Sequence, residues 1–94
     1  MKKSIKALGI FKNKMEKQIK LIWDFRGPNA LLTARHHEIH LKDFIKTEDL
    51  QEWNITGIEE LNEMHTLAFW VVPESEILKY RDILKPHRAT IYTE

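Results

Sequence analysis

The chain contains no cysteine, has no long apolar stretch and carries almost no excess charge. Without cysteine, disulfides and thiolate zinc sites are excluded, so a metal would need His, Asp or Glu ligands. No run of about 18 apolar residues could span a bilayer, and no apolar segment followed by small residues marks a secretory signal. We therefore expect a cytoplasmic protein without a membrane span.

Glycine and proline are also scarce, with three of each in 94 residues. Pro28, Pro73 and Pro86 stand between segments with regular apolar patterns, where proline commonly marks the start or end of an element. With 43% apolar residues, a chain of this length fits one small domain that buries only part of its surface. Association with a partner would be a natural supplement to its stability.

The small net charge hides an uneven distribution. Residues 1–14 contain five lysines and no acidic residue, so residues 15–94 carry a net charge of −4 within a total of +1. We interpret 1–14 as a basic N-terminal extension, either a basic amphipathic arm or a loosely docked end, and 15–94 as a single domain. Met15 would make a sensible start codon. The acidic domain argues against a nucleic-acid partner.

Apolar periodicity predicts six elements. A period of two places Ile19, Leu21, Trp23 and Phe25 on one face of a central strand at 18–26. Helical spacing follows, then two strand-like runs, a second helix and a last strand rich in β-branched and aromatic residues. The expected bounds are a helix at 29–46, strands at 53–61 and 64–72, a helix at 74–85 and a strand at 87–93.

This βαββαβ order resembles the ferredoxin-like fold, an α+β architecture with an antiparallel sheet and two helices on one face. The inner strands are apolar on both faces, so something must cover the open face. We predict a homodimer, with the sheets either facing or joined edge to edge. The arrangement is similar to the dimeric α+β barrel group of cofactor-free monooxygenases, muconolactone-isomerase-like and haem-degrading proteins. The resemblance implies a pocket between helices and sheet and assigns no residue a role.

The stretch TARHHEIHLKDF holds three of the five histidines. His36 and His40 are one helical turn apart and Asp43 follows, which is the spacing that would let them bind one divalent metal ion. The alternative is a solvated or interface-lining helix face. No other cofactor is indicated by the residues.

His36, His40 and Asp43 should lie along a stripe beside the core face of this helix, whereas His37 should turn toward the sheet, between Ala34 and Leu41. It is either a catalytic base in a pocket or a core histidine bonded to a backbone carbonyl or to Tyr80. We expect any small-molecule pocket to include Tyr80 and Trp23. The alternative for the tryptophans is that they are core or dimer anchors.

Asp24 interrupts an apolar strand, with Arg26 on the same side. An acid in this position is either paired with Arg26, Lys20 or a partner chain, or held for a functional role. Arg26, beside a helix N-terminus, could receive an anionic group. Asp24 and Arg26 therefore complete the predicted ligand-binding set, whereas His65 and His87 read as ordinary strand-end residues.

Two functions from different classes fit these features, and whether the protein is an enzyme stays open. The first is a homodimeric small-molecule-binding protein or cofactor-free enzyme with a pocket at His37. The alternative is a non-catalytic module that either resembles the regulatory ACT group or serves in assembly. A protein that binds metal through histidine is a further alternative. RNA-recognition modules share the strand order, but HTLAFWVV lacks their basic, glycine and aromatic pattern.

Overall fold

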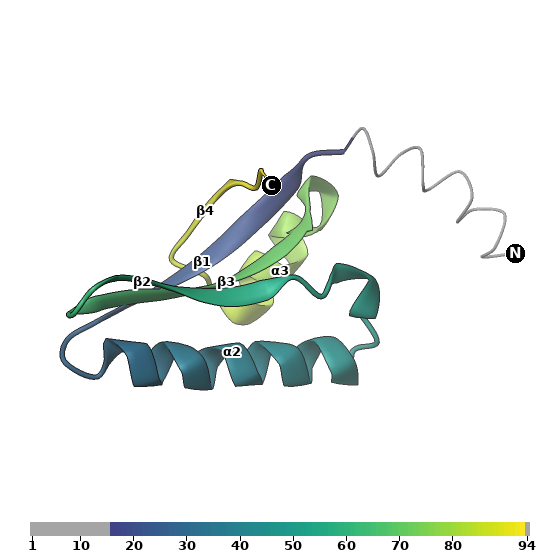
Figure 1. The fold of residues 1–94 in the computed structure, drawn as a ribbon. Helices are drawn as coiled ribbons and strands as arrows, with labels where there is room; N and C mark the ends of the chain where they lie inside the picture. Colours follow the sequence, from purple (N-terminus) through teal and green to yellow (C-terminus); the bar gives the residue numbers. More distant parts are fainter. Residues whose placement is uncertain (1–15, 94) are drawn as a thin grey trace, which may run out of the picture.

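The computed structural model describes residues 16–93, and the predicted basic extension at 1–14 lies outside this part of the chain. Within it the fold is α+β, with a four-stranded antiparallel sheet and two α-helices, as predicted (Figure 1). No helix in these residues is long and apolar enough to cross a membrane. The elements are β1 (Gln18–Arg26), α2 (Ala30–Thr47), the 3₁₀ turn η1 (Gln51–Trp53), β2 (Thr56–Asn62), β3 (His65–Pro73), the 3₁₀ turn η2 (Glu74–Glu76), α3 (Ile77–Leu84) and β4 (Arg88–Ile91).

The strands lie in the order β2-β3-β1-β4, so the first strand is central and pairs with two strands that come later in the chain. β1 pairs with β3 along its whole length, from Gln18 opposite Pro73 to Arg26 opposite His65. β4 pairs with only four residues of β1, from Ile19 to Ile22.

One face of the sheet packs against both helices. Alternation along β1 directs Ile19, Leu21 and Trp23 to this face, and β3 adds Trp70 and Val72. Leu41 and Ile45 of α2 and Tyr80 of α3 join them in one buried cluster. Each large side chain of this kind contributes about 1.5 to 3 kcal/mol when buried, so the cluster holds both helices on the sheet.

The opposite face carries no helix, yet its central residues are buried within the single chain. Ile22, Leu67 and Val71 are at most 4% exposed. Phe69 covers part of this face by lying across Gly57 of β2, so closely that a Cβ on Gly57 would be 2.7 Å from the Phe69 ring. The centre of this face is therefore covered without the second copy that the sequence seemed to require.

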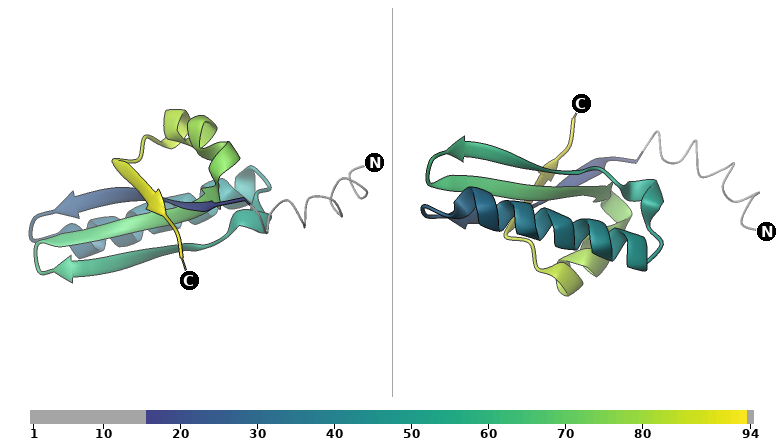
Figure 2. Two further views of the ribbon diagram at one scale, coloured as in Figure 1. Left: turned by 90° about the horizontal axis from the view of Figure 1, so that it is seen from above. Right: turned by 60° about the horizontal axis from the view of Figure 1, so that its bottom comes forward.

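β4 forms the edge of the sheet beside β1. It passes obliquely above β1 on the side away from α2 (Figures 1 and 2), and all four of its residues are exposed. Backbone hydrogen bonds flank the short pairing, from His87 N to Ile22 O and from Tyr92 N to Gln18 O, both 2.8 Å long.

Two predicted starts were wrong by three residues for physical reasons, and the last strand, expected at 87–93, is the shorter Arg88–Ile91. The strand expected from residue 53 begins at Thr56, because Trp53 ends η1 and its carbonyl accepts a 2.6 Å hydrogen bond from Trp70 Nε1. The helix expected from residue 74 begins at Ile77, because the first three residues form the tighter η2 turn. The strand at 18–26 has the predicted bounds.

Candidate functional site

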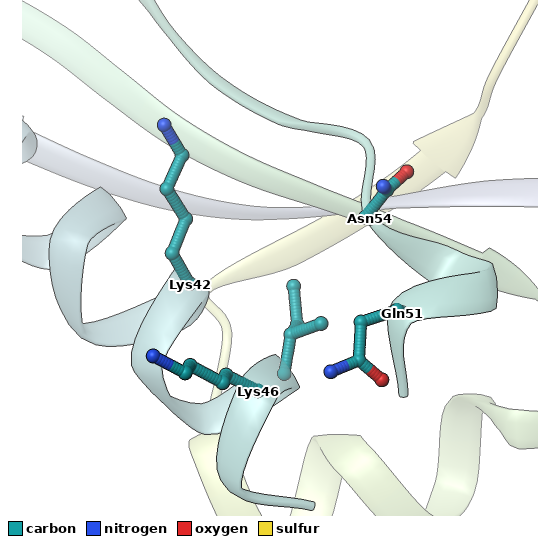
Figure 3. A pocket seen from close by; sticks show the side chains of 5 residues that line it. Lys42, Lys46, Gln51 and Asn54 are labelled. Carbon is teal, nitrogen blue, oxygen red and sulfur yellow. The ribbon is translucent and has the colours of Figure 1, made fainter. Parts of the chain in front are cut away.

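A pocket of about 410 Å³ opens between the C-terminal half of α2 and the segment that follows it. Gln51 reaches toward α2 from η1, and Lys42 and Lys46 project from the helix (Figure 3). Ile45, which is only 4% exposed, and Asn54 complete the lining. Apolar walls with a few polar groups at the rim are typical of small-molecule sites.

The local sequence explains why these residues border the same pocket. Lys42 and Lys46 are four residues apart and so lie one turn apart on the same side of α2. The helix then reverses through Asp49, whose φ is +59°, and Leu50 N donates to Ile45 O at 2.8 Å. This turn returns the chain alongside the helix and brings Gln51 to the pocket.

The two lysines differ in their surroundings. Lys42 Nζ lies 3.6 Å from Glu38 Oε2. The same carboxylate oxygen accepts a 2.9 Å hydrogen bond from Thr56 Oγ1 and so connects α2 with β2. Lys46 has no ion pair with any residue in the range 16–93, and it occupies the last turn of α2, where a cation interacts favourably with the helix dipole.

The aromatic residues expected in a pocket lie in the core instead. Tyr80 is buried against the rings of Phe44, Trp53 and Trp70, and this burial raises the pKa of its phenol above 10.0. Trp23 is also buried, and its Nε1 donates to Leu84 O at 2.9 Å. Neither residue lines the pocket.

His37 lies against the sheet, as predicted, but outside the pocket. Its ring packs on Trp23 and Phe25, with centroid distances of 4.7 and 5.4 Å. Its Nε2 is buried without a hydrogen-bond partner among the described residues, so the predicted bond to a carbonyl or to Tyr80 is absent at that atom. Burial lowers the pKa of His37, and the nearby His40 and His87 lower it further.

Asp24 is paired, but with partners that the sequence analysis did not select. Arg88 donates to both carboxylate oxygens, from Nε at 2.8 Å and from Nη2 at 3.0 Å. His65 Nε2 lies 2.7 Å from Asp24 Oδ1. These hydrogen bonds, that from Arg88 above all, hold the pKa of the Asp24 carboxyl well below its usual range, despite its partial burial.

The other polar groups around Asp24 are also occupied. Arg26 Nη1 lies 3.3 Å from His65 Nδ1, so one neutral tautomer of His65 donates to Asp24 and accepts from Arg26. His87 Nδ1 accepts the backbone N–H of Asp24 at 2.8 Å. With these groups engaged in one another, the network is suited to fastening β4 and β3 to β1 rather than to transferring protons.

The predicted metal ligands do not assemble into a site. His36, His40 and Asp43 are exposed on α2, on the side away from the sheet. Across residues 16–93, no group of three or more His, Cys, Asp or Glu side chains is arranged to hold a metal ion.

The residues that do line the pocket were missed by the sequence analysis. The i, i+4 spacing of Lys42 and Lys46 was a visible signal, although such pairs are common on solvated helix faces. Gln51 and Asn54 gave no signal, because the prediction placed Gln51 in a connection and Asn54 in a strand at 53–61. Comparison with protein-family models, with curated proteins and with solved structures gave no match.

Proposed function

We propose that this protein binds a small molecule in the pocket between α2 and residues 51–54. The observation that supports the proposal is a concave space of about 410 Å³ that is lined by Ile45, two lysines and two amides. Pockets that take up small molecules commonly measure about 300 to 1,000 Å³ and combine an apolar floor with a few polar groups.

We propose binding without turnover, as in a regulatory module. A general base must come within hydrogen-bond reach of its substrate. His65 has both ring nitrogens engaged, His87 accepts a backbone N–H, and the Nε2 atom of His37 is buried among aromatic rings. None of these three histidines lines the pocket, so the predicted catalytic role of His37 is not part of this proposal.

The ferredoxin-like arrangement is likewise a proposal. It is supported by the sequence of elements and by the two helices, which follow β1 and β3 and bury residues in one cluster on a single face. The oblique course and short pairing of β4 are the least regular part of the sheet.

The predicted homodimer also stays a proposal. Burial of Ile22, Leu67 and Val71 removes the need for two sheets to face each other, whereas β2 and β4 leave the outer edges of the sheet free for edge-to-edge pairing. Size-exclusion chromatography with light scattering over a range of protein concentrations tests this arrangement. A constant monomer mass would overturn it.

The binding proposal is tested by filling the pocket. A fragment screen followed by ¹H–¹⁵N NMR should give ligands that shift the side-chain amides of Gln51 and Asn54. Gln51→Trp, which places a large side chain in the pocket from its rim, should abolish the ligand-induced shift of the Asn54 amide. The matched control is Glu52→Trp, in the same turn but outside the pocket lining. Hits that survive Gln51→Trp, or that map elsewhere, would refute the proposal.

A further inference from the structure

We infer that two copies of this chain associate through β4, which pairs antiparallel with β4 of the second copy. This assignment rests on the proposed homodimer and specifies which edge of the sheet forms its interface, and in which register. Three observations carry it: the direction of the backbone groups of β4, the exposure and charge of its side chains, and the contrast with β2 at the other edge.

The backbone of β4 directs hydrogen-bonding groups away from the sheet. Within residues 16–93, β4 has β1 on one side and no strand on the other. Tyr92 N donates a 2.8 Å hydrogen bond to the first residue of β1, and the same register continues through Thr90. Because hydrogen-bonded residues alternate along an antiparallel strand, Thr90 directs its N–H and C=O toward β1, whereas Ala89 and Ile91 direct theirs outward. These outward groups can bind another strand.

A pair of β4 strands centred on Thr90 uses all of these outward groups. In this register Ala89 of each copy lies opposite Ile91 of the other, and the two residues exchange both of their backbone hydrogen bonds. Their side chains lie on one face, so Ile91, which is 60% exposed in the single chain, gains an apolar cross-strand neighbour. Thr90 meets Thr90 of the second copy at the twofold axis. The strand is therefore complementary to itself.

The charge on β4 does not oppose this pairing. Arg88 is the only charged residue among Arg88–Ile91. Its guanidinium donates two hydrogen bonds, of 2.8 and 3.0 Å, to Asp24 of the same chain. Each cation is therefore already neutralised within its own copy when two β4 strands meet.

β2, at the other edge, has two features that protect edge strands from pairing. The side chain of Glu60 is exposed and has no ion pair with any residue in the described part of the chain. A symmetric pairing of β2 would bring two such carboxylates close together. A register shift between Glu60 and Asn62 also interrupts the strand. β4 has no acidic residue and a regular register with β1, so it is the edge that remains open to a second copy.

The pairing involves only four residues of β4 from each copy, so a weak dimer that depends on concentration is expected. Light scattering and NMR of the full chain, from about 10 µM to about 1 mM, test for it. The mean mass should rise toward twice that of the monomer. The amide signals of Ala89 and Ile91 should shift and exchange more slowly with solvent as the concentration rises. The Thr90 amide, which is bonded to β1, should be protected at every concentration.

Proline variants distinguish the two edges of the sheet. Ala89→Pro removes an outward N–H and no hydrogen bond to β1, which is the kind of edge position where proline is tolerated. It should weaken association about tenfold or more, because each dimer loses two hydrogen bonds. Glu60→Pro is the matched control. By the same alternation, counted from Ile55, whose C=O accepts from β3, Glu60 directs its N–H outward from β2. This variant should leave association unchanged.

A single introduced thiol tests the register independently of the proline variants. The natural chain has no cysteine, so Thr90→Cys supplies the only thiol. Opposite residues of a non-hydrogen-bonded antiparallel pair have Cα atoms about 4.5 Å apart, which a disulfide can bridge. Under mild oxidation Thr90→Cys should give a covalent dimer. Thr47→Cys, at an exposed position at the end of α2, should not.

The outcomes separate this assignment from the homodimer itself. Association that survives Ala89→Pro would overturn the assignment to β4 but leave the homodimer, and loss of association in Glu60→Pro instead would move the interface to β2. Equal cross-linking of Thr90→Cys and Thr47→Cys would overturn the register. A constant monomer mass, with no covalent dimer of Thr90→Cys, would overturn both the assignment and the homodimer.

Discussion

Replacing Asp24 with Asn should lower the free energy of unfolding by about 2 kcal/mol at neutral pH. The carboxylate lies at 2.7 to 3.0 Å from three nitrogen atoms of His65 and Arg88. An amide keeps one acceptor oxygen and turns an NH₂ group toward these donors. A hydrogen bond to a charged group contributes about 1.5 to 3 kcal/mol. Because Arg88 is 46% exposed, its ion pair with Asp24 contributes closer to the value for a surface ion pair, about 1 kcal/mol or less.

The effect should depend on pH in a defined direction. Arg88 first, and His65 after it, hold the pKa of Asp24 well below its usual 3.8, so the folded protein binds this proton less readily than the unfolded chain. The stability that Asp24 contributes is complete above about pH 4 and is lost as the pH falls from there toward the folded pKa. The difference between the wild-type protein and the Asn variant should therefore shrink at about pH 2.

Urea unfolding followed by tryptophan fluorescence at both pH values measures this difference. At neutral pH the variant should also melt about 8 to 16 °C lower. Asp43→Asn is the matched control, because it removes the same charge from an exposed position on α2 and should change stability by less than about 0.5 kcal/mol. Equal effects of the two substitutions, or a gap for Asp24 that is the same at both pH values, would refute the reasoning.

Three further predictions follow from the packing. Gly57→Ala should cost about 1 to 3 kcal/mol, because its Cβ would lie 2.7 Å from Phe69; adding Phe69→Leu should restore most of that stability, and an unrelieved cost in the double variant would contradict the steric explanation. Burial lowers the pKa of His37 below 6.5, so the free energy of unfolding should decrease as the pH is lowered through that value. His37→Gln should reduce the slope of this pH dependence, and a His37 NMR titration at or above 6.5 would contradict the explanation. In ultraviolet titration, Tyr80→Phe should remove a tyrosinate phase above pH 10.0, and absence of that phase from the wild-type protein would contradict its burial.

The regular elements could be predicted because their apolar residues repeat with the period of a strand or a helix. The alternation from Ile19 to Phe25 predicted β1 with its observed bounds. Trp53 misled the prediction of β2, since an aromatic residue before a β-branched run is typical of a strand. Its place in η1 depends on a hydrogen bond from Trp70, a contact that no local pattern contains.

The candidate site depended more heavily on long-range contacts. Asp24 was expected to be paired, but its strongest partner, Arg88, is 64 residues away and no spacing rule selects it. The pocket needs the turn at Asp49 to return the chain alongside α2, and helical periodicity gives no information about such a turn. Gly57 was an available signal that went unused, because a glycine within a strand often marks the close approach of another group.

The central position of β1 has a consequence for synthesis of the chain. The side chains that join β1 to β2, β3 and β4 come from residues 39 to 64 positions later. At about 5 to 20 residues per second, the ribosome needs roughly 2 to 8 s to add 39 residues. During that interval the edges of β1 have no partner strand, so a chaperone that binds extended apolar segments should recognise β1 before it recognises β2, β3 or β4.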